Sequence, residues 1–120
     1  MKRIAVVEDN EDNRLLVEAI LSDSYELDQY ASGPEALAGI RATPPDLVLL
    51  DISLPGMDGR EVLRQLRADP ATAHLPVIAL TAHAMTGDRE ALLGVGFDDY
   101  ISKPILDEAL LLDAIAKLIG

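Results

Sequence analysis

Three short, unbroken runs of aliphatic residues constrain the fold of this chain more than any other feature. They occupy residues 4–7, 47–50 and 76–80. None alternates polar with apolar residues as a strand with one wet face does, so each is typical of a strand covered on both faces. Strands of this kind belong to parallel sheets with helices packed on either side. The sequence therefore predicts an α/β fold.

Two further segments complete the expected set of strands. Residues 25–30 alternate imperfectly, as expected of an edge strand with one wetter face, and residues 97–101 form a short fifth strand. Segments with helical spacing follow each strand, so strands and helices alternate along the chain. This alternation favours right-handed crossovers and a flavodoxin-like (βα)5 three-layer sandwich. Its parallel sheet is expected to have five strands in the order 2-1-3-4-5.

Apolar spacing and capping patterns indicate where the helices lie. The helix expected over residues 12–21 is amphipathic through Leu15, Leu16, Ala19 and Ile20. Ser32 and Asp58 each precede a glutamate by three residues, so each is expected to begin a helix with a capping box, in which the glutamate reaches back to the helix start. The last two helices are expected over about 85–93 and 106–119.

Length and composition exclude several classes of function. The chain has 120 residues, which is the size of a single domain spanning 1–120. It has no cysteine, so disulfides, a thiolate nucleophile and cysteine-based metal sites are impossible. No apolar run approaches the length of a membrane span, and we expect a cytoplasmic protein. A net charge of -11 opposes binding to nucleic-acid phosphates and favours cations or basic partners.

Acidic residues follow two of the buried strands at the point where each strand ends. Glu8 and Asp9 follow the first strand, and Asp51 follows the third. In the order 2-1-3-4-5 these two strands are neighbours at the topological switch point, where ligands bind, so the three carboxylates are expected to converge. Purely structural roles remain open as well. Asp51 could be a turn residue, and Glu8 and Asp9 could be acids that complement the dipole of the next helix.

Three converging carboxylates require either protonation of one or a bound cation, and the loop context favours the cation. Mg²⁺ takes one or two carboxylates directly and keeps several waters. Asp9 and Asp51 are the expected direct ligands, with Glu8 bound through water.

Two more strand ends add groups that suit an anion. Thr81 supplies a hydroxyl donor and Lys103 an ammonium. Around Asp51, together with Mg²⁺, they would neutralise or bind the oxygens of a phosphoryl group on its carboxylate, which makes Asp51 a nucleophile. Taken singly, Lys103 is also compatible with a solvated surface lysine, and Thr81 with a strand-end hydroxyl bonded to the backbone.

Over its whole length the chain resembles the receiver domains of two-component response regulators. The loop 81–85 and the run 100–105 are most similar to DivK-type single-domain regulators and to receivers of hybrid histidine kinases. The motifs that carry the resemblance are Glu8-Asp9, Asp51 with the loop 55–59, Thr81-Ala82, and Tyr100 shortly before Lys103-Pro104.

The resemblance implies a role for each matching position. Asp51 would accept a phosphoryl group from a kinase phosphohistidine. Glu8 and Asp9 would hold Mg²⁺, with the backbone carbonyl of Ser53 completing the shell. Thr81 and Lys103 would bind the phosphoryl group.

The family pattern also implies residues that tune and report phosphorylation. Ala82 would leave access to the phosphate, and the residues at the positions of Ser53 and His83 would set the lifetime of the acyl phosphate. Tyr100 would move inward when Thr81 is drawn toward the phosphoryl group, changing the surface of the fourth helix, fifth strand and fifth helix. A cis peptide is expected between Lys103 and Pro104.

These inferences predict a stand-alone phosphorylation switch that signals through protein contacts and is not an enzyme beyond assisting its own phosphorylation and dephosphorylation. Its expected partners are a sensor histidine kinase or histidine phosphotransfer protein and a downstream protein, without nucleic acid or membrane. One alternative is the receiver portion of a hybrid kinase phosphorelay. Another is a Mg-dependent aspartyl-phosphate phosphatase, which Ser53 disfavours because that class has an acid at this position.

The last helix has a wide apolar belt with two possible uses. Ordinary packing is one, and a docking surface or weak homodimer is the other. Its members are Leu110, Leu111, Leu112, Ile115, Leu118 and Ile119.

Overall fold

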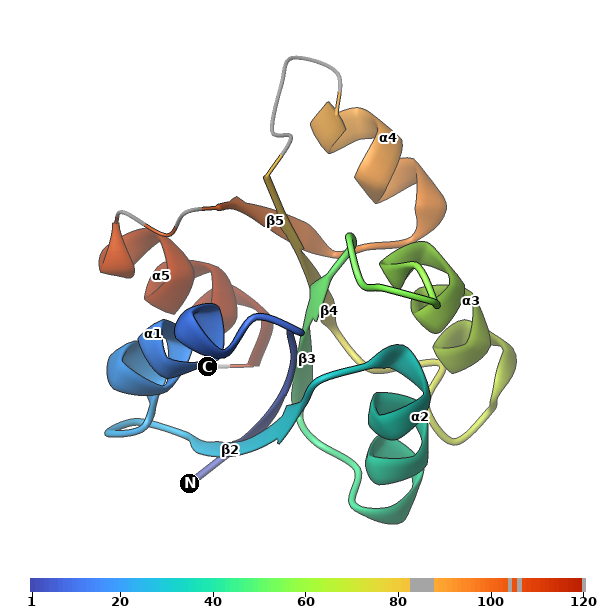
Figure 1. Cartoon of the computed structure of the whole chain (residues 1–120), viewed down its shortest axis with the longest axis horizontal. Helices are drawn as coiled ribbons and strands as arrows, with labels where there is room; N and C mark the ends of the chain where they lie inside the picture. Colours follow the sequence, from blue (N-terminus) through green and yellow to red (C-terminus); the bar gives the residue numbers. More distant parts are fainter. Residues whose placement is uncertain (83–87, 104, 106, 120) are drawn as a thin grey trace.

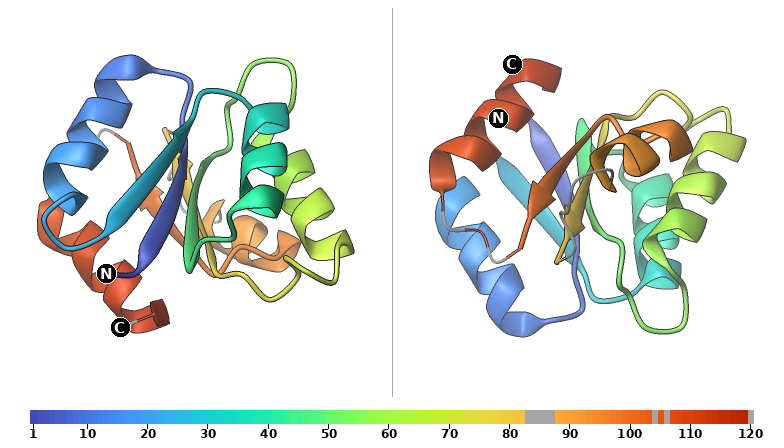
Figure 2. Two further views of the ribbon diagram at one scale, coloured as in Figure 1. Left: turned by 90° about the horizontal axis from the view of Figure 1, so that it is seen from below. Right: turned by 90° about the horizontal axis from the view of Figure 1, so that it is seen from above.

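A computed structural model describes residues 1–82, 88–103, 105 and 107–119. Within these residues, strands and helices alternate and the strands form one parallel sheet in the order β2-β1-β3-β4-β5, which confirms the predicted fold class. Helices α1 and α5 cover one face of the sheet, and α2, α3 and α4 cover the other (Figures 1 and 2). The elements are β1 (Arg3–Val7), α1 (Glu11–Leu21), β2 (Glu26–Tyr30), α2 (Gly33–Ala42), β3 (Leu47–Asp51), α3 (Gly59–Ala68), β4 (Val77–Thr81), α4 (Asp88–Val95), β5 (Asp99–Ser102) and α5 (Glu108–Ile119).

Two apolar cores lie on opposite faces of the sheet. Alternate residues of β3 enter different cores: Val48 and Leu50 pack with α2, α3 and α4, while Leu47 and Leu49 pack with α1 and α5. Every residue of β3 and β4 is buried. The unbroken aliphatic runs therefore arise because both faces of each central strand are covered.

Helix α1 packs on the sheet through a face that shares only Ile20 with the predicted one. Its buried residues are Val17, Ile20 and Leu21, whereas Leu15 is 55% and Leu16 37% exposed. The helix has apolar residues on more than one side, so spacing alone selects the wrong stripe. As a result α1 presents Leu15 and Leu16 to solvent shortly after its start, and Ala19 is exposed as well.

The capping boxes form only in part. Ser32 Oγ accepts the Glu35 N–H at 3.4 Å, and Glu35 Oε2 accepts from the Ala31 N–H at 3.4 Å, one residue before the expected partner. Asp58 caps α3 by accepting the Arg60 N–H at 2.7 Å. Glu61 does not reach back, because Arg64 and Gln65 on the next turn bind its carboxylate, so this half of the prediction is wrong.

Two boundaries differ from the expected ones near the end of the chain. Strand β5 begins at Asp99, because Phe97 is buried in the core and the Asp98 carboxylate accepts the Val77 N–H at 2.8 Å. Helix α4 runs through Gly94 and ends at Val95; Gly96 follows it with a φ of +123, which suits glycine. The expected helix residues 85–87 and 106 lie outside the described part of the chain.

Candidate functional site

The acidic residues meet at the carboxyl edge of the sheet. Val7 of β1 lies opposite Leu50 of β3, so Glu8 and Asp51 emerge side by side. Both are buried, with exposures of 0% and 1%, while Asp9 is exposed. One carboxylate oxygen from each of the three lies within 4.8 Å of the others, which confirms the expected convergence.

Lys103 reaches the same cluster from the end of β5. Its Nζ donates to Asp51 Oδ2 at 2.9 Å and to Glu8 Oε2 at 3.1 Å. Its backbone N–H donates to the carbonyl of Thr81 at 2.7 Å, which ties the end of β5 to the end of β4. The side chain of Lys103 is only 15% exposed, so the surface-lysine alternative is wrong. Thr81 is buried at the end of β4, also at this edge.

Burial and charge shift the ionisation of this cluster. Burial raises the pKa of the Glu8 carboxyl above its usual value, and the neighbouring Asp51 raises it further. Burial alone lowers the pKa of the Lys103 ammonium, but hydrogen bonds to Asp51 and Glu8 outweigh it and the pKa is raised. Lys103 is therefore charged at neutral pH, and its one ammonium pairs with two of the three carboxyl groups.

Asp51 is both a turn residue and a site residue. Its Oδ1 accepts the N–H of Ser53 at 2.8 Å, which is the geometry of an Asx turn, while its Oδ2 faces Lys103. The loop 55–59 then folds back against the strand, with the Gly59 N–H donating to the Ile52 carbonyl at 3.2 Å. A hollow of about 180 Å³ is lined in part by Ser53, Asp58 and Thr81, close to the ends of β3 and β4.

Residues at the start of α1, which the sequence did not reveal as site residues, hold Glu8. Glu8 Oε1 accepts from the Asn10 N–H at 3.2 Å and from Asn13 Nδ2 at 3.3 Å. Arg14 Nη1 donates to the Glu8 carbonyl at 2.8 Å. The available signal was position alone: a helix that starts directly after a strand end brings its first turn over that end.

The remaining predicted residues stay predictions. Ser53 and Ala82 are exposed near the acids, and Tyr100 is partly buried against the core on the side of α2, α3 and α4. His83 and Pro104 lie outside the described residues, and with them the lifetime role predicted for His83 and the cis peptide.

Comparison with known proteins identifies the family. The sequence model of the response regulator receiver domain matches residues 4–116. The chain belongs to this family. It is accordingly a receiver domain of two-component systems, a phosphoacceptor switch.

Similar receivers occur in proteins of very different length. The polar-differentiation response regulator DivK of Brucella ovis is 47% identical over 105 residues, which cover 87% of this receiver and 85% of DivK. The sensor histidine kinase GacS of Pseudomonas protegens is 42% identical over 112 residues, which cover 90% of this receiver but only 12% of GacS. The receiver domain of the sensor histidine kinase PA1611 from Pseudomonas aeruginosa, solved with a magnesium ion in its active-site cleft, is 37% identical with a TM-score of 0.89; the match covers 99% of this chain and 98% of that one.

The donor set of this receiver fits a divalent cation. Receiver domains bind Mg²⁺ in an acidic pocket, and here three carboxylates converge with one ammonium, which leaves negative charge uncompensated. Carboxylate oxygens are ligands that Mg²⁺ takes in proteins. Asp9 is exposed, so the cluster is accessible to solvent at this residue.

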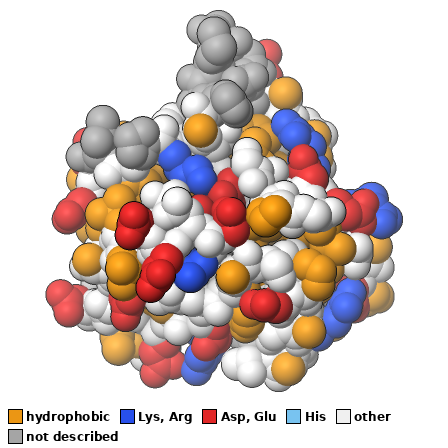
Figure 3. Space-filling view, viewed as in Figure 1, with side chains coloured by type: hydrophobic (Ala, Val, Ile, Leu, Met, Phe, Trp, Pro, Cys, Tyr) orange, Lys and Arg blue, Asp and Glu red, His pale blue; other side chains and the backbone are white. Residues whose placement is uncertain are grey.

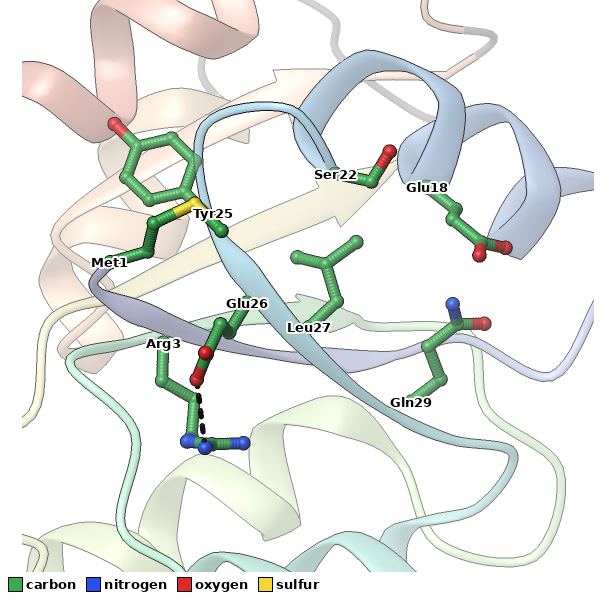
Figure 4. A pocket seen from close by; sticks show the side chains of 8 residues that line it. All are labelled: Met1, Arg3, Glu18, Ser22, Tyr25, Glu26, Leu27 and Gln29. Carbon is green, nitrogen blue, oxygen red and sulfur yellow. Dashed lines mark hydrogen bonds and ion pairs between the residues drawn. The ribbon is translucent and has the colours of Figure 1, made fainter.

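The wider surface is acidic, and a second hollow lies away from the acids. Figure 3 shows acidic side chains scattered over one face, with basic side chains among them. A hollow of about 500 Å³ lies between α1 and β2, where Arg3 pairs with Glu26 at 2.9 Å (Figure 4). Arg3 begins β1, at the opposite edge of the sheet from Asp51, so this hollow is separate from the site.

Among the described residues, none of the helices has both the length and the apolar character that crossing a bilayer requires.

Proposed function

We propose that Asp51 accepts a phosphoryl group from a partner's phosphohistidine and that the resulting acyl phosphate changes the contacts of this receiver with other proteins. The observation that carries the proposal is the Lys103 ammonium, which bridges the buried carboxylates of Asp51 and Glu8 beside the exposed Asp9. A partly buried ammonium between two carboxylates, at the edge of the sheet where ligands bind, can pair with an anion that is transferred to one of them.

Each residue has a part in the transfer. Asp9, Asp51 and the Ser53 carbonyl would hold Mg²⁺, with Glu8 bound through water. The ion supplies positive charge that neutralises the phosphoryl oxygens. Lys103 pairs with another phosphoryl oxygen, and the Thr81 hydroxyl donates to a third. The Ser53 N–H holds Oδ1 of the Asp51 carboxylate and so fixes its orientation.

Phosphorylation and hydrolysis each form one bond to phosphorus and break another. An Asp51 carboxylate oxygen forms a bond to phosphorus while the P–N bond of phosphohistidine breaks, and the electron pair leaves on the imidazole nitrogen. In hydrolysis, water attacks phosphorus, the bond to Asp51 breaks, and inorganic phosphate leaves. The chain thus assists its own phosphorylation and dephosphorylation.

The donor is a sensor histidine kinase or a histidine phosphotransfer protein, and the output is an unidentified protein. The likeness to GacS also supports a phosphorelay in which the group moves on to a second histidine. Purified partners distinguish the two versions: in the relay version one histidine donates the group to Asp51 and a histidine of a different protein or domain accepts it, whereas in the other version only the donor's own histidine exchanges it.

The central test is incubation with Mg²⁺ and acetyl phosphate, followed by intact mass. We expect one phosphoryl adduct on wild type and none on Asp51→Ala. Asp113→Ala, which removes an exposed acid from α5, is the matched control and keeps the adduct. An adduct on Asp51→Ala, or none on wild type, would falsify the proposal.

A further inference from the structure

The two oxygens of Glu8 are held by different parts of the fold. Oε2 accepts from Lys103 Nζ at 3.1 Å, on the side that faces Asp51. Oε1 accepts from the Asn10 N–H at 3.2 Å and from Asn13 Nδ2 at 3.3 Å, on the side that faces α1. The strand end is thereby tied to β5 through one oxygen and to α1 through the other.

The asparagine amide is a second donor to Glu8 Oε1 and so restricts the terminal torsion of this side chain more than the Asn10 N–H does alone. The terminal torsion of glutamate is broad, so a carboxylate held at one oxygen rotates readily. Glu8 is 0% exposed, which leaves little room for water to replace a lost donor. Without Asn13 only the Asn10 N–H would oppose the pull of Lys103 on Oε2.

Asn13 is itself placed firmly. Its backbone N–H donates to the capping oxygen Asn10 Oδ1 at 3.1 Å, so its Cα lies in the first turn of α1. Arg14, the next residue, anchors the same turn to the Glu8 carbonyl at 2.8 Å. The amide of Asn13 is therefore presented to Glu8 from a fixed backbone.

We propose that Asn13 is a positioning residue that orients the Glu8 carboxylate for the water shell of the bound Mg²⁺. This inference rests on the proposed function, because it assigns Asn13 a part in the same metal site. Asn13 touches neither the metal nor the phosphoryl group and acts only through Glu8.

Isothermal titration of the metal-free protein with Mg²⁺ tests the inference without any phosphoryl transfer. Asn13→Ala is expected to raise the Mg²⁺ dissociation constant by about 3- to 10-fold, at or below the lower limit of the roughly 10- to 100-fold range for residues that orient metal ligands, because Glu8 acts through water. Alanine is the best helix former, so α1 is retained. Asn13→Gln keeps an amide donor and is expected to recover most of the affinity.

A control and a double variant separate positioning from loss of stability. Ser32→Ala removes the cap of another helix, α2, and is expected to keep the wild-type dissociation constant. In a Glu8→Gln background, Asn13→Ala is expected to cause less than its single-variant change, since its target carboxylate is gone.

Different results would overturn this inference and the proposed function. An unchanged Mg²⁺ affinity in Asn13→Ala overturns the inference, as does an equal loss with and without Glu8. If wild type itself fails to bind Mg²⁺, the proposed function fails and this inference fails with it. Circular dichroism of each variant shows whether it is folded, and Asn13→Gln provides the comparison if Asn13→Ala is not.

Discussion

Gly59 occupies a point in the loop 55–59 where no side chain fits. A Cβ there would lie 2.5 Å from the Asp51 carbonyl oxygen and 2.5 Å from the Ile52 Cα. Both neighbours belong to the backbone of the strand end, so neither moves without displacing the site. Gly94 lies on the exposed side of α4, where an added Cβ would meet nothing within 4 Å, and it offers a matched comparison.

We expect Gly59→Ala to lower the free energy of unfolding by about 2 kcal/mol or more, because overpacking forces the backbone to shift. Gly94→Ala is expected to raise it by about 0.5 to 1 kcal/mol, since alanine favours the helix. Urea unfolding of both variants measures the difference. Equal effects of the two substitutions would show that the loop does not press on the end of β3.

The raised pKa of Glu8 makes the stability of the metal-free protein depend on pH. The folded state holds the Glu8 proton more tightly than the unfolded chain, so protonation favours folding. The contribution of Glu8 to stability therefore increases as pH falls through the raised pKa toward the ordinary value of 4.5. We expect wild type to gain stability relative to Glu8→Gln over this range in urea unfolding with EDTA. If the stability of wild type relative to Glu8→Gln stays constant or decreases as the pH falls, the raised pKa is contradicted.

Site residues could be predicted from the sequence where the topology of the sheet alone decides the position of the side chain. Parallel strands end at one edge of the sheet, so Asp51, Thr81 and Lys103 could be brought together from the sequence. The hydrogen-bond partner of each Glu8 carboxylate oxygen could not be predicted, because it depends on the turn between β1 and α1. Asn13 was missed for this reason: its amide meets Glu8 through the geometry of that turn, which periodicity does not encode.

At the scale of elements, α1 shows why spacing gave the wrong face. Leu15, Leu16 and Ile20 fit a helical stripe as well as Val17, Ile20 and Leu21 do, and only packing against the sheet selects the second set. The strands were easier to predict, because an unbroken aliphatic run has no face to choose. The residues left over, Leu15 and Leu16, lie in the helix that begins directly after Asp9 and Asn10.

We expect this exposed part of α1 to contact the partner that carries the phosphohistidine. Leu16→Ser should slow phosphoryl transfer from a histidine phosphotransfer protein by about fivefold, the loss of about 1 kcal/mol of apolar contact. Phosphorylation by acetyl phosphate should be unchanged. Radiolabel transfer at limiting partner concentration measures the first rate.

Leu93→Ser is the matched control for this surface. Leu93 on α4 is 36% exposed, against 37% for Leu16, so the two variants lose similar side chains from different helices. We expect Leu93→Ser to keep the wild-type transfer rate. Equal slowing by both variants would mean that α1 has no special part in docking.

At the scale of the whole molecule, net charge opposes self-association while one apolar surface favours it. Each copy carries a charge of -11, so two copies repel at low salt. Leu110 of α5 is nevertheless 62% exposed and lies at a hollow of about 510 Å³ that Tyr100, Ile105 and Lys117 also line. The predicted switch residue and the exposed leucine thus share one surface.

We expect a weak homodimer through this surface, strengthened by the phosphoryl mimic beryllium fluoride. Light scattering should give a mass that increases with concentration, and more steeply at higher salt, because salt screens the repulsion between acidic copies. Leu110→Ser should abolish the increase, whereas Leu15→Ser, which alters a leucine of similar exposure on α1, should not. A monomer mass at every concentration, with and without the mimic, excludes the dimer. If salt weakens the dimer instead, ion pairs rather than Leu110 stabilise the contact.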